Sequence, residues 1–177
     1  MKKLRLILIP ILVLLLLCSC TSTPAQSETT TKSTNDQNYC TITIDITDIK
    51  DNISSLKSEK EPFVTSDGYI LKELQVEISE GDTAFDILKK ACKENACTDN
   101  CKYCKDGIQL DSTYTAEYGS YYIEGIHQLY NKDCGDMSGW LFSINDEFAQ
   151  VGASDYTVQN GDSITFSYTC DMNAIFG

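Results

Sequence analysis

The sequence is poor in the side chains on which most enzymes depend. Its 177 residues include one histidine, His127, and one tryptophan, Trp140. It contains no Gly-x-Ser-x-Gly elbow, no phosphate-binding glycine loop and no His-Glu-x-x-His helix. His127 with Cys134 would make a Cys–His pair, but we expect His127 to lie at the surface or on an edge strand. These absences indicate a protein that binds without catalysing a reaction.

Basic residues are also scarce. The chain has 14 Lys and Arg against 26 Asp and Glu, which gives a formal net charge of −12. This balance argues against nucleic acid and against highly anionic ligands. It suits a neutral or cationic ligand, or solubility at a cell surface. No Asp-x-Asp-x-Asp-Gly loop suggests calcium, and we predict no metal site.

The chain has no apolar run long enough to cross a membrane. Its longest run, Leu6–Leu17, is short of the roughly 20 residues that a span requires, and it follows a basic start. It fits the apolar part of a secretory signal, and Leu17-Cys18-Ser19-Cys20 resembles the lipobox of bacterial lipoproteins. We therefore expect a signal peptide over 1–19, a lipidated Cys20, and a Thr/Ser-rich flexible tether over 20–38. The alternative is an ordinary signal cleaved nearby. The predicted location is the extracytoplasmic face of the cell membrane, held by lipid.

Residues 39–177 have the length of one domain. Thr83 and Asp86 form a capping-box variant ahead of apolar residues at helical spacing, which predicts the main helix. A polar segment over 51–61 predicts one or two weak helical turns that Pro62 ends. Alternating patterns predict strands at Cys40–Ile46, Leu74–Ile78, Tyr114–Ile126 (broken at Gly119), Trp140–Ile144 and Ser163–Thr169. This order predicts an α+β fold, in which a β-grasp-like mixed sheet packs on one main helix.

Cysteines are numerous for a chain of this kind, and disulfides are expected outside the cytoplasm. If the last two predicted strands pair antiparallel, Cys134 lies beside Cys170, and we predict a bridge between them. The cluster of Cys92, Cys97, Cys101 and Cys104 has three interpretations. Disulfides that staple the loop are favoured over a tetrahedral metal or iron–sulfur site and over redox-active thiols. An odd number of cysteines outside the signal and lipid leaves at least one thiol unpaired or paired with another molecule.

Several motifs follow one another in an order that resembles a known family. They are Gly81-Asp82-Thr83-Ala84-Phe85, Tyr118-Gly119-Ser120-Tyr121-Tyr122, Gly139-Trp140-Leu141-Phe142-Ser143, Val151-Gly152-Ala153-Ser154-Asp155 and Asn160-Gly161-Asp162. The series is similar to the transcobalamin-like C-terminal domain, a β-grasp module of bacterial surface proteins and of vitamin B12 carriers. The resemblance covers most of residues 40–171. In the carriers this module closes over one face of a cobalamin that a helical domain also holds.

The resemblance implies a set of ligand-facing residues: Tyr118, Tyr121, Trp140, Leu141, Phe142, Gln150, Val151 and Gly152. Trp140 has an alternative place in the core, and the tyrosines have an alternative role in cross-strand packing. The resemblance does not extend to the helical domain that forms the other part of the cobalamin site in the carriers. Either a partner therefore completes the site, or the module has no corrinoid role. The leading hypothesis is a ligand-binding module for a cobalamin-like corrinoid. A protein–protein interaction module comes second, and a thiol redox protein third.

Overall fold

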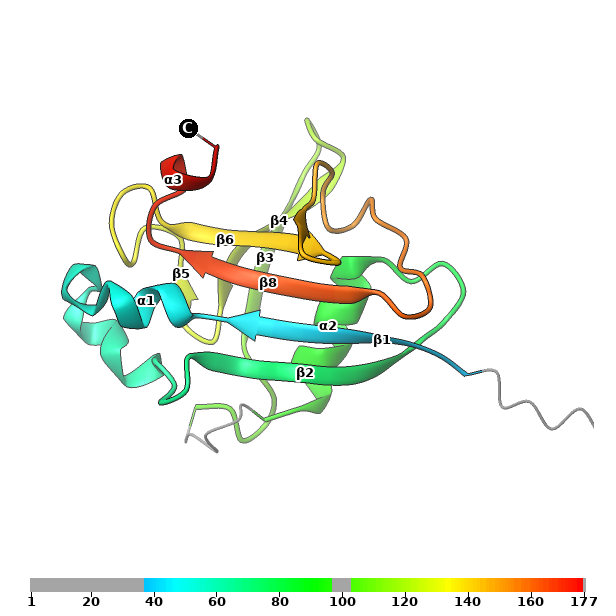
Figure 1. Cartoon of the computed structure of the whole chain (residues 1–177), viewed down its shortest axis with the longest axis horizontal. Coiled ribbons are helices and arrows are strands. Elements are labelled where there is room, and N and C mark those ends of the chain that lie inside the picture. Colours follow the sequence, from blue (N-terminus) through cyan, green and yellow to red (C-terminus); the bar gives the residue numbers. More distant parts are fainter. Residues whose placement is uncertain (1–36, 97–102, 177) are drawn as a thin grey trace, which may run out of the picture. The chain divides into compact units, whose positions relative to one another are not determined.

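Two strands that are distant in the sequence, β1 and β8, lie side by side at the centre of the main sheet (Figure 1). The computed structural model describes residues 37–96 and 103–176. β1 and β8 are parallel, with Thr41 opposite Ser163, whereas β2 pairs antiparallel with β1 and β6 antiparallel with β8. The strand order is β2-β1-β8-β6-β7, so the sheet is mixed, as predicted. Its strands are β1 (Asn38–Asp45), β2 (Tyr69–Ile78), β6 (Gly139–Ile144), β7 (Glu147–Phe148) and β8 (Ser163–Thr169).

A second, antiparallel sheet was not predicted. It consists of β3 (Leu110–Thr115), β4 (Ser120–Ile126) and β5 (Leu129–Tyr130). The segment predicted as one strand with a break at Gly119 is in fact a hairpin, with Thr115 opposite Ser120 and Gly119 at φ +65° in the turn. Because the two arms pair with each other, they form a separate sheet. The prediction of a single sheet is therefore wrong, and the β-grasp assignment stays a prediction.

The main helix, α2 (Ala84–Glu94), begins where the sequence predicts. The Thr83 side chain accepts a hydrogen bond from the Asp86 N–H, and the Asp86 carboxylate accepts one from the Thr83 N–H, so the capping box is complete. The ion pair with Lys89 and the bonds from Thr83 outweigh the effect of burial and lower the pKa of Asp86 to about 2. Six residues of the apolar face are buried: Ala84, Phe85, Ile87, Leu88, Ala91 and Cys92.

The remaining helices are short: α1 (Thr47–Asp51), the 3₁₀ helices η1 (Ile53–Ser55) and η2 (Ser58–Phe63), and α3 (Asn173–Phe176). Pro62 lies inside η2, whereas the sequence predicted that it would end the helical segment. The turn tolerates it because the Val64 N–H bonds to the Glu61 carbonyl across Pro62, and no N–H of Pro62 is needed. None of the helices that the structure describes is long and apolar enough to span a membrane.

The core lies between α2 and one face of the main sheet. Ile42 and Ile44 of β1, together with Ile164 and Phe166 of β8, are at most 1% exposed. Their neighbours along both strands, such as Thr41 and Ser163, lie on the opposite face and are only half-buried. This alternation is what the sequence pattern predicted for strands with one buried face.

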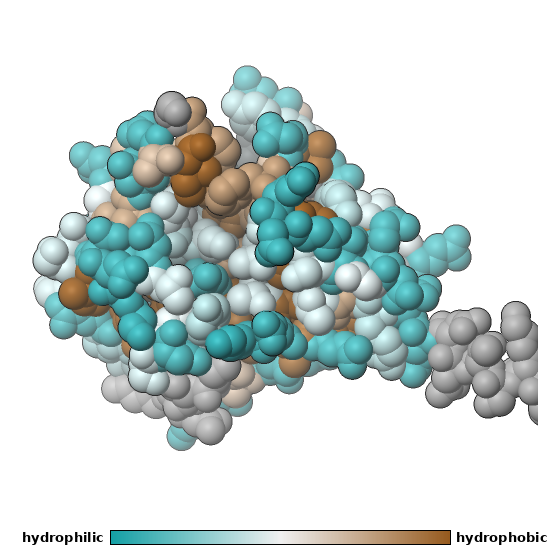
Figure 2. Space-filling model, viewed as in Figure 1, coloured by the Kyte–Doolittle hydropathy of each residue, from teal (hydrophilic) through white to brown (hydrophobic). Residues whose placement is uncertain are grey.

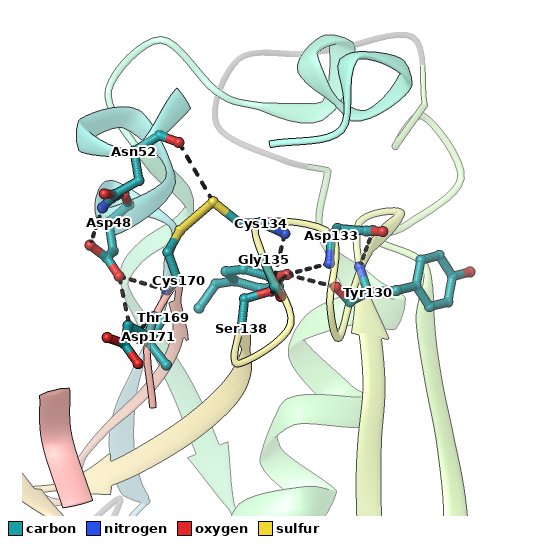
Figure 3. Close-up of a disulfide and its surroundings, with 11 residues drawn as sticks. Asp48, Asn52, Tyr130, Asp133, Cys134, Gly135, Ser138, Thr169, Cys170 and Asp171 are labelled. Atoms are coloured by element: carbon teal, nitrogen blue, oxygen red, sulfur yellow. Dashed lines mark hydrogen bonds between the residues drawn. A yellow bond between two sulfur atoms is a disulfide. The ribbon is translucent and has the colours of Figure 1, made fainter. Parts of the chain in front are cut away.

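A disulfide joins Cys134, ahead of β6, to Cys170 at the end of β8 (Figure 3). The predicted bridge is therefore present, and its cause is the predicted antiparallel pairing of β6 with β8. Asp48 of α1 supports it, since its carboxylate accepts hydrogen bonds from the Cys170 N–H (2.7 Å) and the Thr169 hydroxyl (3.2 Å). The bridge thus lies where α1, β8 and the loop before β6 meet.

The Tyr168 hydroxyl makes a second junction, and its partners Tyr130, Asp133 and Ser138 are labelled in Figure 3. It donates to the Tyr130 carbonyl (2.7 Å), accepts from the Asp133 N–H (3.1 Å) and lies 2.9 Å from the Ser138 hydroxyl. Each partner also has another bond, because the Asp133 N–H reaches the Tyr130 carbonyl and Ser138 Oγ donates to the Gly135 carbonyl. Tyr168 therefore ties β8 to β5 and to the loop that carries Cys134.

The other cysteines that the structure describes are Cys40 and Cys92, which are buried free thiols, and Cys104. Cys92 is a free thiol that is 2% exposed on α2, so its prediction as a disulfide candidate is wrong. It belongs to the helix's buried face rather than to the loop after it, and burial raises its pKa to about 12. Cys104 is disulfide-bonded, as predicted. Cys97 and Cys101 lie outside the described residues, as do Cys20 and the signal.

Candidate functional site

A groove with a cavity volume of about 710 Å³ opens between the β3–β4 hairpin and the segment that follows β7. Phe176 of α3 contributes to the same groove. Figure 2 shows apolar surface beside α3, facing the hollow that separates α3 from the β3–β4 hairpin. Three chain segments far apart in the sequence therefore build one concave surface.

The loop wall of this groove, residues 149–156, is fastened to the start of α2. The first two N–H groups of the helix donate to loop carbonyls, Ala84 to Tyr156 (3.0 Å) and Phe85 to Ala153 (2.9 Å). These are N–H groups that a helix cannot satisfy by itself. Ser154 connects the loop to β4, because its hydroxyl accepts from the Tyr121 N–H and lies 2.7 Å from the Ser120 hydroxyl. The groove wall is thus held by both the helix and the second sheet.

The β3–β4 hairpin contributes an aromatic wall to the groove. Tyr118, Tyr121 and Tyr122 line the groove with 73%, 41% and 52% of their surfaces exposed. The Tyr121 ring stacks on Phe85 of α2, with ring centroids 4.5 Å apart. Burial and the nearby negative charge of Glu124 raise the pKa of Tyr122, so its hydroxyl stays protonated at neutral pH. No partner within the described residues bonds the hydroxyls of these three tyrosines, which leaves ring faces and donors open to a ligand.

A second hollow of about 140 Å³ adjoins the groove. The two share Tyr121, Tyr122 and Gly152. All eight residues that the resemblance implied as ligand-facing line one hollow or the other. Tyr118, Gln150 and Val151 belong to the groove, and Trp140, Leu141 and Phe142 belong to the second hollow.

Trp140 is a core residue that also lines the second hollow. It is 6% exposed, its Nε1–H donates to the Leu129 carbonyl (2.9 Å), and its ring meets Tyr168 edge to face. Because the one polar atom of the indole is already bonded inside the protein, a ligand could reach only an apolar part of the ring. Phe142 is half-buried and stacks on Phe166. The tyrosines, rather than Trp140, therefore present the accessible aromatic surface.

Gly152 lies at the junction of the two hollows, where the backbone passes too close to its neighbours for a side chain. A Cβ atom there would overlap the Ser120 side chain and lie 2.9 Å from an oxygen of Asp155. Val151, next in the loop, is 51% exposed. Gln150 makes one long bond, from its amide nitrogen to the Phe148 carbonyl (3.4 Å), so its carbonyl oxygen remains available.

Sequence reasoning missed several groove residues. Asp155 lies within a motif that the resemblance singled out, but its carboxylate carried no distinguishing signal. Phe176 had none at all, because residues beyond the last predicted strand were assigned no element. In the structure its ring lies 6.0 Å from that of Phe148. The further groove residues are Thr115, Ser120, Tyr122 and Ala149.

His127 is buried, at 1% exposed, so its predicted surface position is wrong. It occupies the turn between β4 and β5 with φ +53°, and its N–H bonds to the Gln109 carbonyl. The ring packs edge to face on Phe63, and burial lowers its pKa, so the imidazole is neutral at pH 7. Among residues 37–96 and 103–176, no three His, Cys, Asp or Glu side chains gather as metal ligands would.

Residues 81–170 match the family described as Domain of unknown function (DUF4430). This range includes every residue that lines the groove or the second hollow, except Phe176. The chain belongs to the DUF4430 family. Curated protein sequences provide no match to this DUF4430 chain. A candidate metal-binding protein from Ruminococcus gnavus ATCC 29149 is similar in structure at 13% identity and a TM-score of 0.43, over 75% of this chain and 97% of that protein. Haptocorrin in complex with Cbi is similar at 18% identity and a TM-score of 0.48, over 78% of this chain and 27% of haptocorrin.

Proposed function

We propose that this DUF4430 protein is a non-catalytic module that binds a flat, amphipathic ligand, with a cobalamin-like corrinoid as the leading candidate. The observation that carries the proposal is the groove, which is lined by a loop fixed to the start of α2 and by three exposed tyrosines whose hydroxyls have no partner within the described residues. A flat macrocycle buries its faces on aromatic rings, while its polar edge takes hydrogen bonds from hydroxyl and amide groups.

The family-level resemblance supports the corrinoid in particular. The residues that it singled out come from three separate segments, yet they line adjoining hollows. The mixed sheet and the capped α2 are compatible with the β-grasp fold of that family. A groove open on one side also agrees with a module that covers one face of its ligand while a partner covers the other.

The proposed location is the extracytoplasmic face of the cell membrane, through a lipid on Cys20 and the tether over 20–38. The lipobox-like Leu17-Cys18-Ser19-Cys20 supports this anchoring. Cells fed a tagged fatty acid should incorporate the tag into the protein, and replacement of Cys20 by alanine should abolish this labelling. Undiminished labelling of the Cys20→Ala protein would contradict lipid anchoring at this residue.

The corrinoid proposal is tested by titrating the purified protein with cobinamide, following the corrinoid's visible absorbance, the quenching of Trp140 fluorescence and the heat of binding. The Tyr118→Ala variant should lose about fivefold to thirtyfold in affinity, because an exposed ring worth roughly 1–2 kcal/mol of contact is removed. Ile53→Ala is the matched control, since Ile53 is 44% exposed and lies on η1, outside the groove. Absence of binding at high micromolar cobinamide would end the corrinoid proposal.

One observation favours a second candidate, a protein–protein interaction module. Exposed apolar side chains continue past the groove, which Val151 (51%) and Phe176 (61%) line, to Tyr114 (55%) and Phe148 (42%) outside it. Contiguous apolar surface of this kind often marks an interface. A photo-crosslinking residue at position 118 in intact cells would test this candidate, because a protein adduct that excess cobinamide leaves unchanged would favour the interaction module.

A further inference from the structure

We propose that the groove selects ligands that carry a positive charge, with Asp155 as the residue that determines this specificity. The inference rests on the proposed function and narrows its ligand class to flat amphipathic cations. Within the described residues, Asp155 is the only charged residue that lines the groove, and no charged residue lines the second hollow. A ligand in the groove therefore meets one formal charge, which is negative.

The Asp155 carboxylate is not engaged elsewhere. The residue is exposed, and its side chain has no hydrogen bond or ion pair within the part of the chain that the structure describes. Its backbone is nevertheless fixed, because the Asp155 N–H donates to the Gly152 carbonyl (2.9 Å) and the preceding Ser154 is bonded to β4. The carboxylate is thus held at the groove by a rigid loop while its oxygens remain available.

The tyrosine rings add to the same preference. The face of an aromatic ring is electron-rich and attracts cations, and three tyrosines and a carboxylate in one groove offer a positive group two kinds of favourable contact. Lys89 lies over the ring of Phe85, on which Tyr121 stacks, and it pairs with Asp86 (2.8 Å). Because Lys89 contacts Asp86 and Phe85 of its own helix, its charge is partly neutralised there, and it does not line the groove.

A carboxylate about 4–5 Å from a ligand's positive charge at a partly solvated site should change affinity by about fivefold to tenfold. The chain's net charge of −12 adds a longer-range attraction for cations. Both contributions decrease as salt increases, because the screening length is about 10 Å at 0.1 M ionic strength. The preference for a cation should therefore be largest at low salt.

The test uses two probes with the same corrin ring, aquocyanocobinamide, which carries a single positive charge, and dicyanocobinamide, which is neutral. We expect the intact protein to bind the cationic probe about fivefold to tenfold more tightly at low salt. Asp155→Asn should abolish most of this preference and leave affinity for the neutral probe within about twofold. Glu61→Gln, which removes the same charge from an exposed position on η2 outside the groove, should retain the preference.

The outcomes separate this inference from the proposed function. If both probes bind equally well and Asp155→Asn changes neither affinity, the charge-selection inference is wrong while ligand binding stands. If neither probe binds, the corrinoid proposal fails and the inference fails with it. Because the Asp155 side chain has no partner among residues 37–96 and 103–176, the variant should unfold at the same urea concentration as the parent protein, so lost binding cannot be ascribed to lost folding.

Discussion

Removal of the Cys134–Cys170 disulfide should weaken the fold mainly through the unfolded chain. The perturbation is the double variant Cys134→Ala/Cys170→Ala, which deletes the cross-link without placing a hydroxyl in the buried position of Cys134 (1% exposed). Asp48 continues to bond the backbone N–H of residue 170 in the variant, and Ser138 continues to accept from that of residue 134. The folded structure should therefore persist, while the unfolded chain gains freedom.

The magnitude follows from the length of the loop that the bridge closes. The two cysteines are 36 residues apart, and the entropy of closing a loop of that length corresponds to about 4 kcal/mol at 25 °C. This value is a large part of the roughly 5–15 kcal/mol that stabilises an ordinary domain. We accordingly expect the variant to remain folded at 25 °C but to unfold at a much lower urea concentration.

Equilibrium urea unfolding measures both the free energy of unfolding and its dependence on urea. The m-value should rise in the double variant, because an unfolded chain without the cross-link exposes more surface. Cys92→Ala is the control, since it deletes a buried free thiol without opening a loop, and it should cost about 1 kcal/mol. A double variant that loses no more stability than Cys92→Ala, with an unchanged m-value, would refute this reasoning.

Three further predictions concern single side chains. Tyr168→Phe should lower the free energy of unfolding by about 1–2 kcal/mol, a moderate loss because the partners of the Tyr168 hydroxyl keep other hydrogen bonds. The control Tyr122→Phe should change it by less than about 0.5 kcal/mol in the same urea experiment. The pKa of Asp86 lies at about 2, below its ordinary value of 3.8, so the stability that its carboxylate contributes is complete above pH 4 and disappears as the pH falls toward 2. Asp86→Asn should therefore lower the free energy of unfolding by about 1 kcal/mol at pH 7, allowing for solvent screening. An equal loss at pH 2 would contradict a stabilising role for the ionised carboxylate. Gly152→Ala should reduce cobinamide affinity at least as much as Tyr118→Ala, because the added Cβ overlaps Ser120. Parent-like affinity in calorimetry would mean that the Ser120 side chain moves aside without changing the groove.

Local patterns were sufficient to predict much of the main sheet and its helix. The Thr83–Asp86 pair predicted the start of α2, and alternation predicted strands that form β1, β6 and β8. The disulfide followed because the pairing of two strands brings their ends together. The second sheet could not be predicted in this way, since a run rich in β-formers does not reveal whether it continues or turns back on itself.

The groove could be predicted only in part, for a related reason. Aromatic residues such as Tyr118 and Tyr121 were visible as candidates, but their exposure depends on which sheet the hairpin joins. Trp140 occurs in the same motif series, yet its indole N–H bonds to Leu129, a residue of the sheet that was not expected. Phe176 enters the groove from a helix of four residues, too short to leave a periodic pattern.

The position of β8 between β1 and β6 has a consequence for the order of events in folding. During synthesis from the N-terminus, β1 and β2 appear long before β8. Because β8 lies between β1 and β6, these two strands are joined in the sheet only through β8. Until residues 163–169 emerge, the apolar faces of Ile42 and Ile44 lack the strand that covers their flank. The central strand of the main sheet is therefore the last to be added. The growing chain is most exposed to proteases and to aggregation just before β8 pairs with β1 and β6.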